Sequence, residues 1–187
     1  GYRDQSALEK LLVEQMSSEK NALHCELGEL LERATVRDYI VPDVLPHPAV
    51  VLVYGAGGDG KSMTCWTIAK HIAEGRPFMV RGKHVPVDQG PVLILNGDQA
   101  EDILAEQLME AELPAKGVFI QNDWNLQRYS QFARLMDRIK PKLVIIDSLI
   151  GCSGGRAFDE NKSDFATPLY WLSRNNGTTF HGATILI

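Results

Sequence analysis

Eight consecutive residues carry the clearest chemical signal in this 187-residue chain. They match the pattern GxxxxGK[ST] in full, as Gly55, Ala56, Gly57, Gly58, Asp59, Gly60, Lys61 and Ser62. Glycines let a backbone curl so that several N–H groups converge on one anion. The N-terminus of a following helix adds the positive end of its dipole. The pattern therefore predicts a loop that binds the phosphates of a nucleotide.

Two side chains of this loop have defined chemistry toward a nucleotide. Lys61 would reach the β- and γ-phosphates, and the hydroxyl of Ser62 would be a ligand of Mg²⁺. We include the next residue, Met63, in the predicted binding segment. A glycine-rich turn that happens to precede a helix could match the same motif. However, this loop also follows an apolar run, Val50–Tyr54, and opens an amphipathic helix, as the motif requires. We therefore expect ATP with Mg²⁺ as the ligand.

A second candidate site residue ends another apolar run. Leu143–Ile146 is followed by Asp147, and ligands gather at the carboxyl edge of an open parallel sheet. An aspartate at this place in a nucleotide-binding domain holds the magnesium ion, often through water. An acid after an apolar strand is common and can be purely structural, but it follows a complete phosphate loop here. We expect Ser62 and Asp147 to share one Mg²⁺.

A third run, Val92–Leu95, is followed by Asn96-Gly97-Asp98-Gln99. We predict that Asp98 is the general base that activates the attacking water, which makes Lys61, Asp98 and Asp147 the candidate catalytic residues. The alternative is a solvated loop acid or the N-cap of a helix over 100–111. If Asp98 is not the base, Glu101 and Asp102 are the next acids to test.

Apolar runs alternate with amphipathic segments through most of the chain. The runs are Val50–Tyr54, Val92–Leu95, Val118–Ile120, Leu143–Ile146 and Thr184–Ile187, and the helical patterns lie near 61–74, 100–111, 127–139 and 164–175. Continuously apolar strands are buried on both faces. The alternation predicts an α/β fold with a parallel sheet covered by helices on both faces. Residues 82–84 indicate the turn of a small hairpin, and the prolines of 41–48 indicate a loop.

The first part of the chain has a different sequence pattern, that of a helix. Ser6-Ala7-Leu8-Glu9 is a capping box, and leucines follow at helical spacing. We expect helix over about 6–33, in one or two pieces. This gives an N-terminal helical segment over 1–35 and an ATPase core over 36–187. The helix could be a docking arm for a neighbouring subunit or could fold onto its own core.

Composition excludes several classes of protein. The formal net charge is −5, so no global basic field attracts nucleic acid, and any contact with it must be local or built by assembly. Three well-separated cysteines, Cys25, Cys65 and Cys152, indicate reduced thiols in a cytoplasmic protein and not a disulfide framework. The histidines have no metal-binding spacing, and no apolar run predicts a membrane span.

Several segments of the sequence resemble those of one family. Tyr39–Ser62, Ile72–Phe78, Gln89–Asp98 and Val144–Leu149 are similar to RecA-like ATPases of the RepA type, relatives of the DnaB-type hexameric replicative helicases. The resemblance covers about residues 38–187. It implies a RecA-like P-loop core, ATP hydrolysis, and a homo-oligomeric ring acting on single-stranded DNA. By position it gives Lys61 and Ser62 their nucleotide roles, makes Asp147 the Walker B acid, and places Asp98 where the family has its catalytic glutamate.

The chain departs from that family in two places. Asp98 is one methylene shorter than the usual glutamate, and we expect slower hydrolysis. The chain ends at Ala183–Ile187, a strand that the resemblance places between the phosphate-loop strand and the Asp147 strand. The sensor residue, arginine finger and later strands are not in this sequence, so we expect a core truncated at its C-terminus.

Two functions remain open from the sequence. The first is a helicase-like or recombinase-like motor on single-stranded DNA. The second is a slow ATP-binding regulatory or assembly module without motor activity. The loop after Asp147, with Arg156 and Lys162, could touch DNA or be a plain surface loop. Three tryptophans could stack on bases, but packing is the better interpretation: Trp66, Trp124 and Trp171.

Overall fold

The computed structural model describes residues 26–34, 37–97, 99–148, 151–153, 166–176 and 181–187. Contacts along the chain divide it into two units, Gly1–Val36 and Arg37–Ile187. The described part of the first unit contains one helix, α2 (Leu27–Arg33). None of its residues is buried, and its leucines are exposed. Helix α2 lies within the expected helix over 6–33, and the part of that expectation over 6–25 lies outside the described residues.

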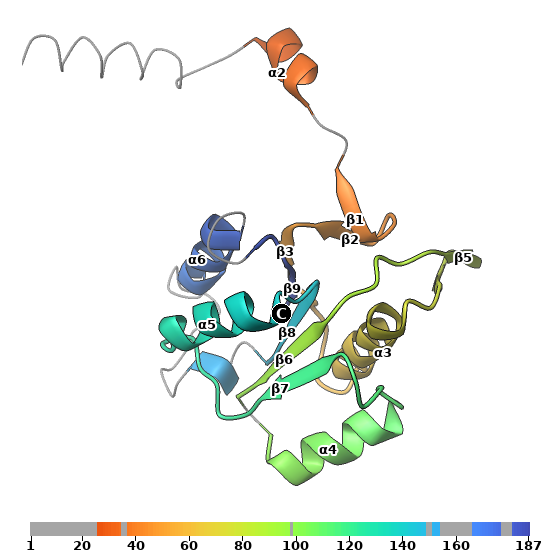
Figure 1. The fold of residues 1–187 in the computed structure, drawn as a ribbon, viewed down its shortest axis with the longest axis vertical. Coiled ribbons are helices and arrows are strands. Elements are labelled where there is room, and N and C mark those ends of the chain that lie inside the picture. The colour runs from red at the N-terminus through yellow and green to blue at the C-terminus, as the bar shows by residue number, and fades with distance from the viewer. Residues whose placement is uncertain (1–25, 35–36, 98, 149–150, 154–165, 177–180) are drawn as a thin grey trace, which may run out of the picture. The chain divides into compact units, whose positions relative to one another are not determined.

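A five-stranded parallel sheet forms the centre of the second unit (Figure 1). Its strands are β3 (Ala49–Val51), β6 (Val92–Asn96), β7 (Val118–Gln121), β8 (Leu143–Asp147) and β9 (Thr184–Leu186). The order across the sheet is β3-β9-β8-β6-β7. The last strand thus lies between the phosphate-loop strand and the Asp147 strand, as the resemblance implied. Because the strands are parallel, their carboxyl ends share one edge.

Alternate residues of each strand point to opposite sides of the sheet, so apolar strands present an apolar surface on both faces. Helices cover both of these faces. On one face, Val92, Ile94 and Ile145 pack with α3 (Lys61–Glu74) and α4 (Glu101–Glu110). On the other, Leu93, Leu95 and their neighbours pack with α5 (Tyr129–Ile139) and α6 (Ala166–Asn176). The predicted fold class, a parallel sheet covered on both faces, is confirmed. Trp66 and Trp124 are buried in these two cores, as the packing interpretation expected.

Two hairpins flank the central sheet. β4 (Phe78–Val80) and β5 (Lys83–Val85) pair antiparallel around Arg81 and Gly82, one residue earlier than the predicted turn. Both turn residues have positive φ, 49° and 76°, which is the geometry of a two-residue hairpin turn.

The proline-rich stretch forms the second hairpin, where the sequence had indicated only a loop. β1 (Asp38–Val41) pairs antiparallel with β2 (Leu45–His47). The Val44 N–H donates to the Val41 carbonyl at 3.1 Å, which closes a four-residue turn. Pro42 takes the second position and Asp43, with φ of 60°, takes the third, as in a type II turn. The prolines therefore shape the hairpin and do not prevent it.

Candidate nucleotide site

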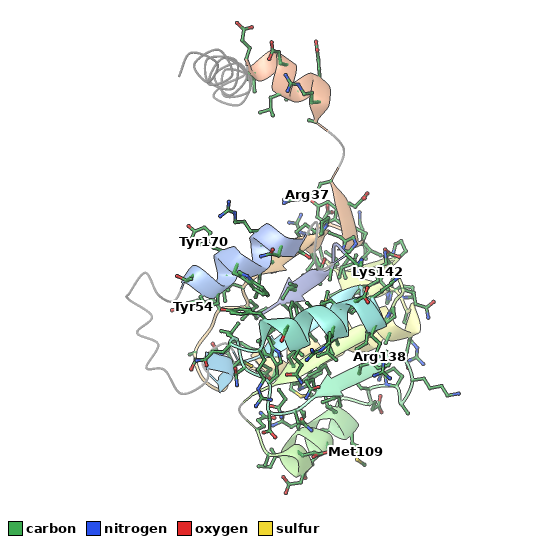
Figure 2. All side chains as sticks on the ribbon, turned by 60° about the vertical axis from the view of Figure 1, so that its left-hand side comes forward. Arg37, Tyr54, Met109, Arg138, Lys142 and Tyr170 are labelled. Atoms are coloured by element: carbon green, nitrogen blue, oxygen red, sulfur yellow. The ribbon has the colours of Figure 1, made fainter. Side chains whose placement is uncertain are left out.

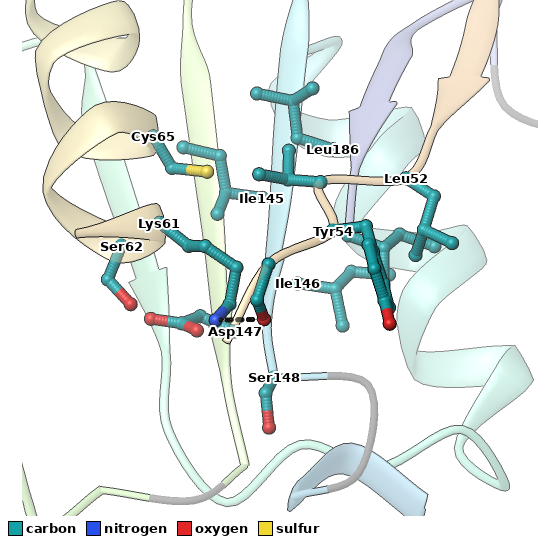
Figure 3. Close-up of a pocket in the computed structure, with 13 residues that line it drawn as sticks. Leu52, Tyr54, Lys61, Ser62, Cys65, Ile145, Ile146, Asp147, Ser148 and Leu186 are labelled. Carbon is teal, nitrogen blue, oxygen red and sulfur yellow. Dashed lines mark hydrogen bonds between the residues drawn. The ribbon is translucent and has the colours of Figure 1, made fainter. Parts of the chain in front are cut away.

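The predicted phosphate loop connects β3 to the first turn of α3 (Figure 3). Gly58 and Gly60 have φ of 86° and 77°. In this region the backbone of any residue that carries a Cβ is strained, so glycine is favoured. A Cβ added at Gly57, Gly58 or Gly60 would meet no atom within 4 Å. The loop therefore borders open space on the side of these glycines, and a ligand has room there.

Both charged side chains of the loop bond to its own backbone. Lys61 Nζ donates to the carbonyl oxygens of Gly55 at 2.8 Å and Ala56 at 2.7 Å. The Ala56 N–H donates to Asp59 Oδ2 at 2.7 Å. One N–H group of the loop thus already bonds an anionic oxygen. A loop whose N–H groups donate to an oxyanion, with a lysine at its end, fits the phosphates of a nucleotide.

A pocket of about 480 Å³ brings the loop together with the end of β8. Figure 3 shows Lys61, Ser62 and Asp147 with their side chains directed into it. The rest of the lining is mainly apolar and comes from the ends of β3, β8 and β9 and from α3: Leu52, Val53, Tyr54, Gly55, Cys65, Ile145, Ile146, Ser148, Leu186 and Ile187. Residues more than eighty positions apart therefore meet at the carboxyl edge of the sheet.

The charge of Asp147 acts across this pocket on α3. Cys65 lies one turn beyond Lys61 and is buried. Burial raises the pKa of its thiol to about 11, and the negative charge of Asp147 contributes to the increase. Cys65 is therefore a neutral thiol at physiological pH, and it forms part of the apolar wall between Ile145 and the loop.

The oxygen atoms at this edge fit a magnesium ion. Mg²⁺ is usually held by one or two protein oxygen ligands, with water and substrate phosphates completing its octahedron. Ser62 and Asp147 supply a hydroxyl and a carboxylate to the same pocket. Within the described ranges, no cluster of three or more histidine, cysteine or acidic side chains could hold a metal. An ion here would thus depend on the nucleotide for its remaining ligands.

The candidate base, Asp98, lies outside the described residues, but its neighbours do not. Asn96, the last residue of β6, pairs in register with Asp147. The residues on both sides of position 98 are thus at the same edge of the sheet as the pocket. Glu101 and Asp102, the other acids considered, are exposed in the first turn of α4 and do not line the pocket.

Asn96 was not among the sequence candidates. It is buried, and its amide bonds the backbone of Gln99 and the side chain of Asn122. A polar residue at the end of an otherwise apolar strand is the one signal that could have indicated it. The loop after Asp147, with Arg156 and Lys162, lies outside the described residues.

Tyr54 lines the larger pocket, whereas Tyr170 lines a second, smaller hollow beside β3. Tyr54, directly before the loop, is 91% exposed, and Tyr170 on α6 is 72% exposed (Figure 2). The hollow has a volume of about 330 Å³ and is lined by Val50, Leu52, Leu169, Tyr170 and Ser173. No carboxylate, lysine, arginine or histidine lines this hollow, so the charged groups of the site belong to the larger pocket.

A family model described as "AAA domain" matches residues 17–187. No curated protein matches the sequence. In the portion of the chain that the structure describes, every helix is too short or too polar to cross a bilayer.

Proposed function

The chain belongs to the AAA domain family, a family of P-loop ATPases, and we propose that it is a RecA-like motor of the RepA and DnaB type. In this proposal it hydrolyses ATP in the presence of Mg²⁺ and acts on single-stranded DNA as a homo-oligomeric ring. The match to the family supports the general part of this proposal, namely an ATPase domain that binds nucleotide. The helicase-like part rests on the sequence phrases that resemble the RepA type.

One observation carries the catalytic proposal: the phosphate loop and Asp147 line the same pocket. Lys61 would exchange its two loop carbonyls for the β- and γ-phosphates, which are negatively charged and therefore form stronger bonds with its ammonium group. Ser62 and Asp147 would hold Mg²⁺, which neutralises charge on the phosphates during transfer. Asp98 would orient and deprotonate the attacking water.

A slower nucleotide-binding module is the second candidate, and Asp59 favours it. Its carboxylate already accepts a hydrogen bond from the Ala56 N–H, a group of the loop that would bind phosphate. A second negative charge beside the phosphates opposes nucleotide binding. The net charge of −5 also gives single-stranded DNA no general attraction. Such a module would bind ATP, hydrolyse it slowly, and change its partners with nucleotide state.

Steady-state ATP hydrolysis, measured with and without a single-stranded oligonucleotide, separates the two. A motor predicts hydrolysis that DNA stimulates, and a module predicts slow hydrolysis that DNA does not change. Lys61→Ala measured in parallel supplies the background rate, because it lacks the lysine that would bind the phosphates. If the parent protein neither binds ATP nor exceeds this background, both proposals are wrong.

A further inference from the structure

The outer face of α4 is acidic, and it also exposes apolar side chains. Four of its residues are exposed acids: Glu101, Asp102, Glu106 and Glu110. The helix contains no lysine or arginine, and none of these acids makes an ion pair with a residue that the structure describes. Ile103 is 50% exposed and Met109, labelled in Figure 2, is 78% exposed. The free side of α4 therefore combines negative charge with apolar area.

Two of these acids are unfavourable for the helix itself. Glu101 and Asp102 lie in the first turn, where the helix dipole favours negative charge. Glu106 and Glu110, however, are four positions apart, so two like charges are neighbours on the helix surface. Glu110 also lies in the last turn, beside the negative end of the dipole. Positive charge supplied by a partner would offset both effects.

The outer face of α5 has the opposite charge. Arg134 and Arg138 are exposed and are again four positions apart, and Lys140 is the C-cap of the helix. Neither arginine makes an ion pair with any residue in the described ranges. Asp137 is the one acid in the sequence of this helix, and its carboxylate lies 3.3 Å from Nε2 of His181. The free side of α5 is therefore positive.

These two faces cannot meet within one chain. α4 packs through Leu104 and Leu108 on one face of the central sheet, and α5 packs through Phe132 and Met136 on the other (Figure 1). Their outer sides therefore point away from each other. Between two copies they can meet, with α4 of one copy against α5 of the next. Such a contact uses different surfaces on the two copies and leaves one of each free, so further copies can add head to tail.

We propose that the acidic face of α4 binds the basic face of α5 on a second copy of this chain. Complementary charge selects the partner and orients the contact, and exposed apolar side chains supply area that is removed from water. This inference rests on the homo-oligomer of the proposed function and names the two faces that build it. It does not depend on catalysis, because no residue of either helix lines the nucleotide pocket.

The charge of α4 is the reason to choose a second copy over nucleic acid as the partner. A basic helix such as α5 could by itself contact a phosphate backbone. That interpretation gives the acids of α4 no role, since nucleic acid would be repelled by them. A second copy uses both faces at once.

Sedimentation velocity of the full chain, over a series of concentrations, tests the contact. We expect the protein to self-associate in about 0.05 M salt and to associate about tenfold or more weakly in about 0.5 M salt, because salt screens charges on exposed surfaces. Association that proceeds beyond dimers with rising concentration is expected of a head-to-tail contact.

Charge reversal tests each face and then the pair. Arg134→Glu with Arg138→Glu places like charges opposite α4 and should weaken association by about tenfold or more. Glu106→Arg with Glu110→Arg should weaken it similarly from the other side. All four substitutions in one chain restore opposite charges, so association should return to within about threefold of the parent. Variants that merely disturb folding would not rescue each other in this way.

The matched control is Arg81→Glu with Lys83→Glu in the β4–β5 hairpin. Both residues are exposed, and the pair changes the net charge as much as the α5 pair does. It should associate as the parent does. Thermal unfolding of every variant shows whether it is folded. Should the α5 variant not fold, the α4 variant still tests the contact, since its substitutions remove unfavourable charges from the helix.

Four results would overturn the inference. They are a parent that stays monomeric at low salt, association that neither pair of reversals weakens, absence of rescue in the fourfold variant, or equal weakening in the hairpin control. Loss of oligonucleotide binding by the α5 variant, with parental self-association, would be the second of these and would assign α5 to nucleic acid. Failure of the proposed function looks different. In that case the parent would hydrolyse ATP no faster than Lys61→Ala, whatever its state of association.

Discussion

The ammonium group of Lys61 bonds two carbonyl oxygens of its own loop and no group of the hydrophobic core. We therefore expect Lys61→Ala to abolish ATP binding and to change the unfolding temperature little, since the lost bonds are partly exposed. Titration with a fluorescent ATP analogue, together with thermal unfolding, measures both effects. Lys83→Ala, which removes an exposed lysine from β5, is the control and should bind normally. Unchanged affinity in Lys61→Ala would refute the assignment of the phosphate loop.

Cys65 gives a prediction about pH. Burial and the charge of Asp147 raise the pKa of its thiol from 9.0 to about 11. The unfolded chain therefore loses this proton at lower pH than the folded chain, and the free energy of unfolding falls as pH rises from 9 to 11. We expect Cys65→Ala to reduce the loss of stability between pH 8 and pH 10 by about 1 kcal/mol. Urea unfolding at the two pH values measures it, and an equal loss in both proteins would contradict it.

Among the elements, the junction between the β1–β2 hairpin and the central sheet depends on Thr184, at the start of β9. Thr184 is fully buried, and its hydroxyl donates to the Pro46 carbonyl at 2.8 Å. Since that uses its only proton, Nδ1 of His47, at 3.1 Å, must be the donor in their mutual bond. The hydroxyl thus satisfies one polar group on each of two residues of the hairpin.

We expect Thr184→Val to lower the free energy of unfolding by about 1–3 kcal/mol, because it removes the hydrogen-bond partner of a donor on His47 and of an acceptor on Pro46, both at half-buried positions. Thr67→Val is the matched control. Its hydroxyl also bonds a backbone carbonyl, that of Met63 at 2.8 Å, but on the exposed side of α3. Urea unfolding compares the two. A Thr184→Val variant as stable as Thr67→Val would show that the buried bonds contribute nothing.

The elements also show what the sequence could and could not predict. Apolar runs located all five strands of the sheet, and helix α3 was predicted with its observed bounds, because both signals are local. The signal for the turn at Pro42 and Asp43 was also local, but the prolines of 41–48 were interpreted as a loop and not as a hairpin. Asn96 could not be predicted in the same way. Its bonds reach Asn122, just beyond β7, and only the folded sheet brings these segments together.

For the molecule as a whole, the net charge of −5 limits how DNA could be bound. A single copy has no general attraction for phosphates, so repeated weak contacts in an assembly would have to supply the affinity. We expect single-stranded DNA binding to appear only at protein concentrations where the chain self-associates. Fluorescence anisotropy of a labelled oligonucleotide and sedimentation of the same samples measure this. Tight DNA binding by a monomer would contradict the expectation.

The most direct test of the nucleotide site is ATP binding by calorimetry, with and without Mg²⁺, in the parent protein and in Asp147→Asn. If Ser62 and Asp147 hold the ion at the pocket edge, Mg²⁺ tightens ATP binding in the parent. Asp147→Asn then loses most of that gain and keeps its affinity for metal-free ATP. Asp137→Asn, an exposed aspartate on α5, is the control and behaves as the parent. An Asp147→Asn protein with the full Mg²⁺-dependent gain would contradict the proposed site.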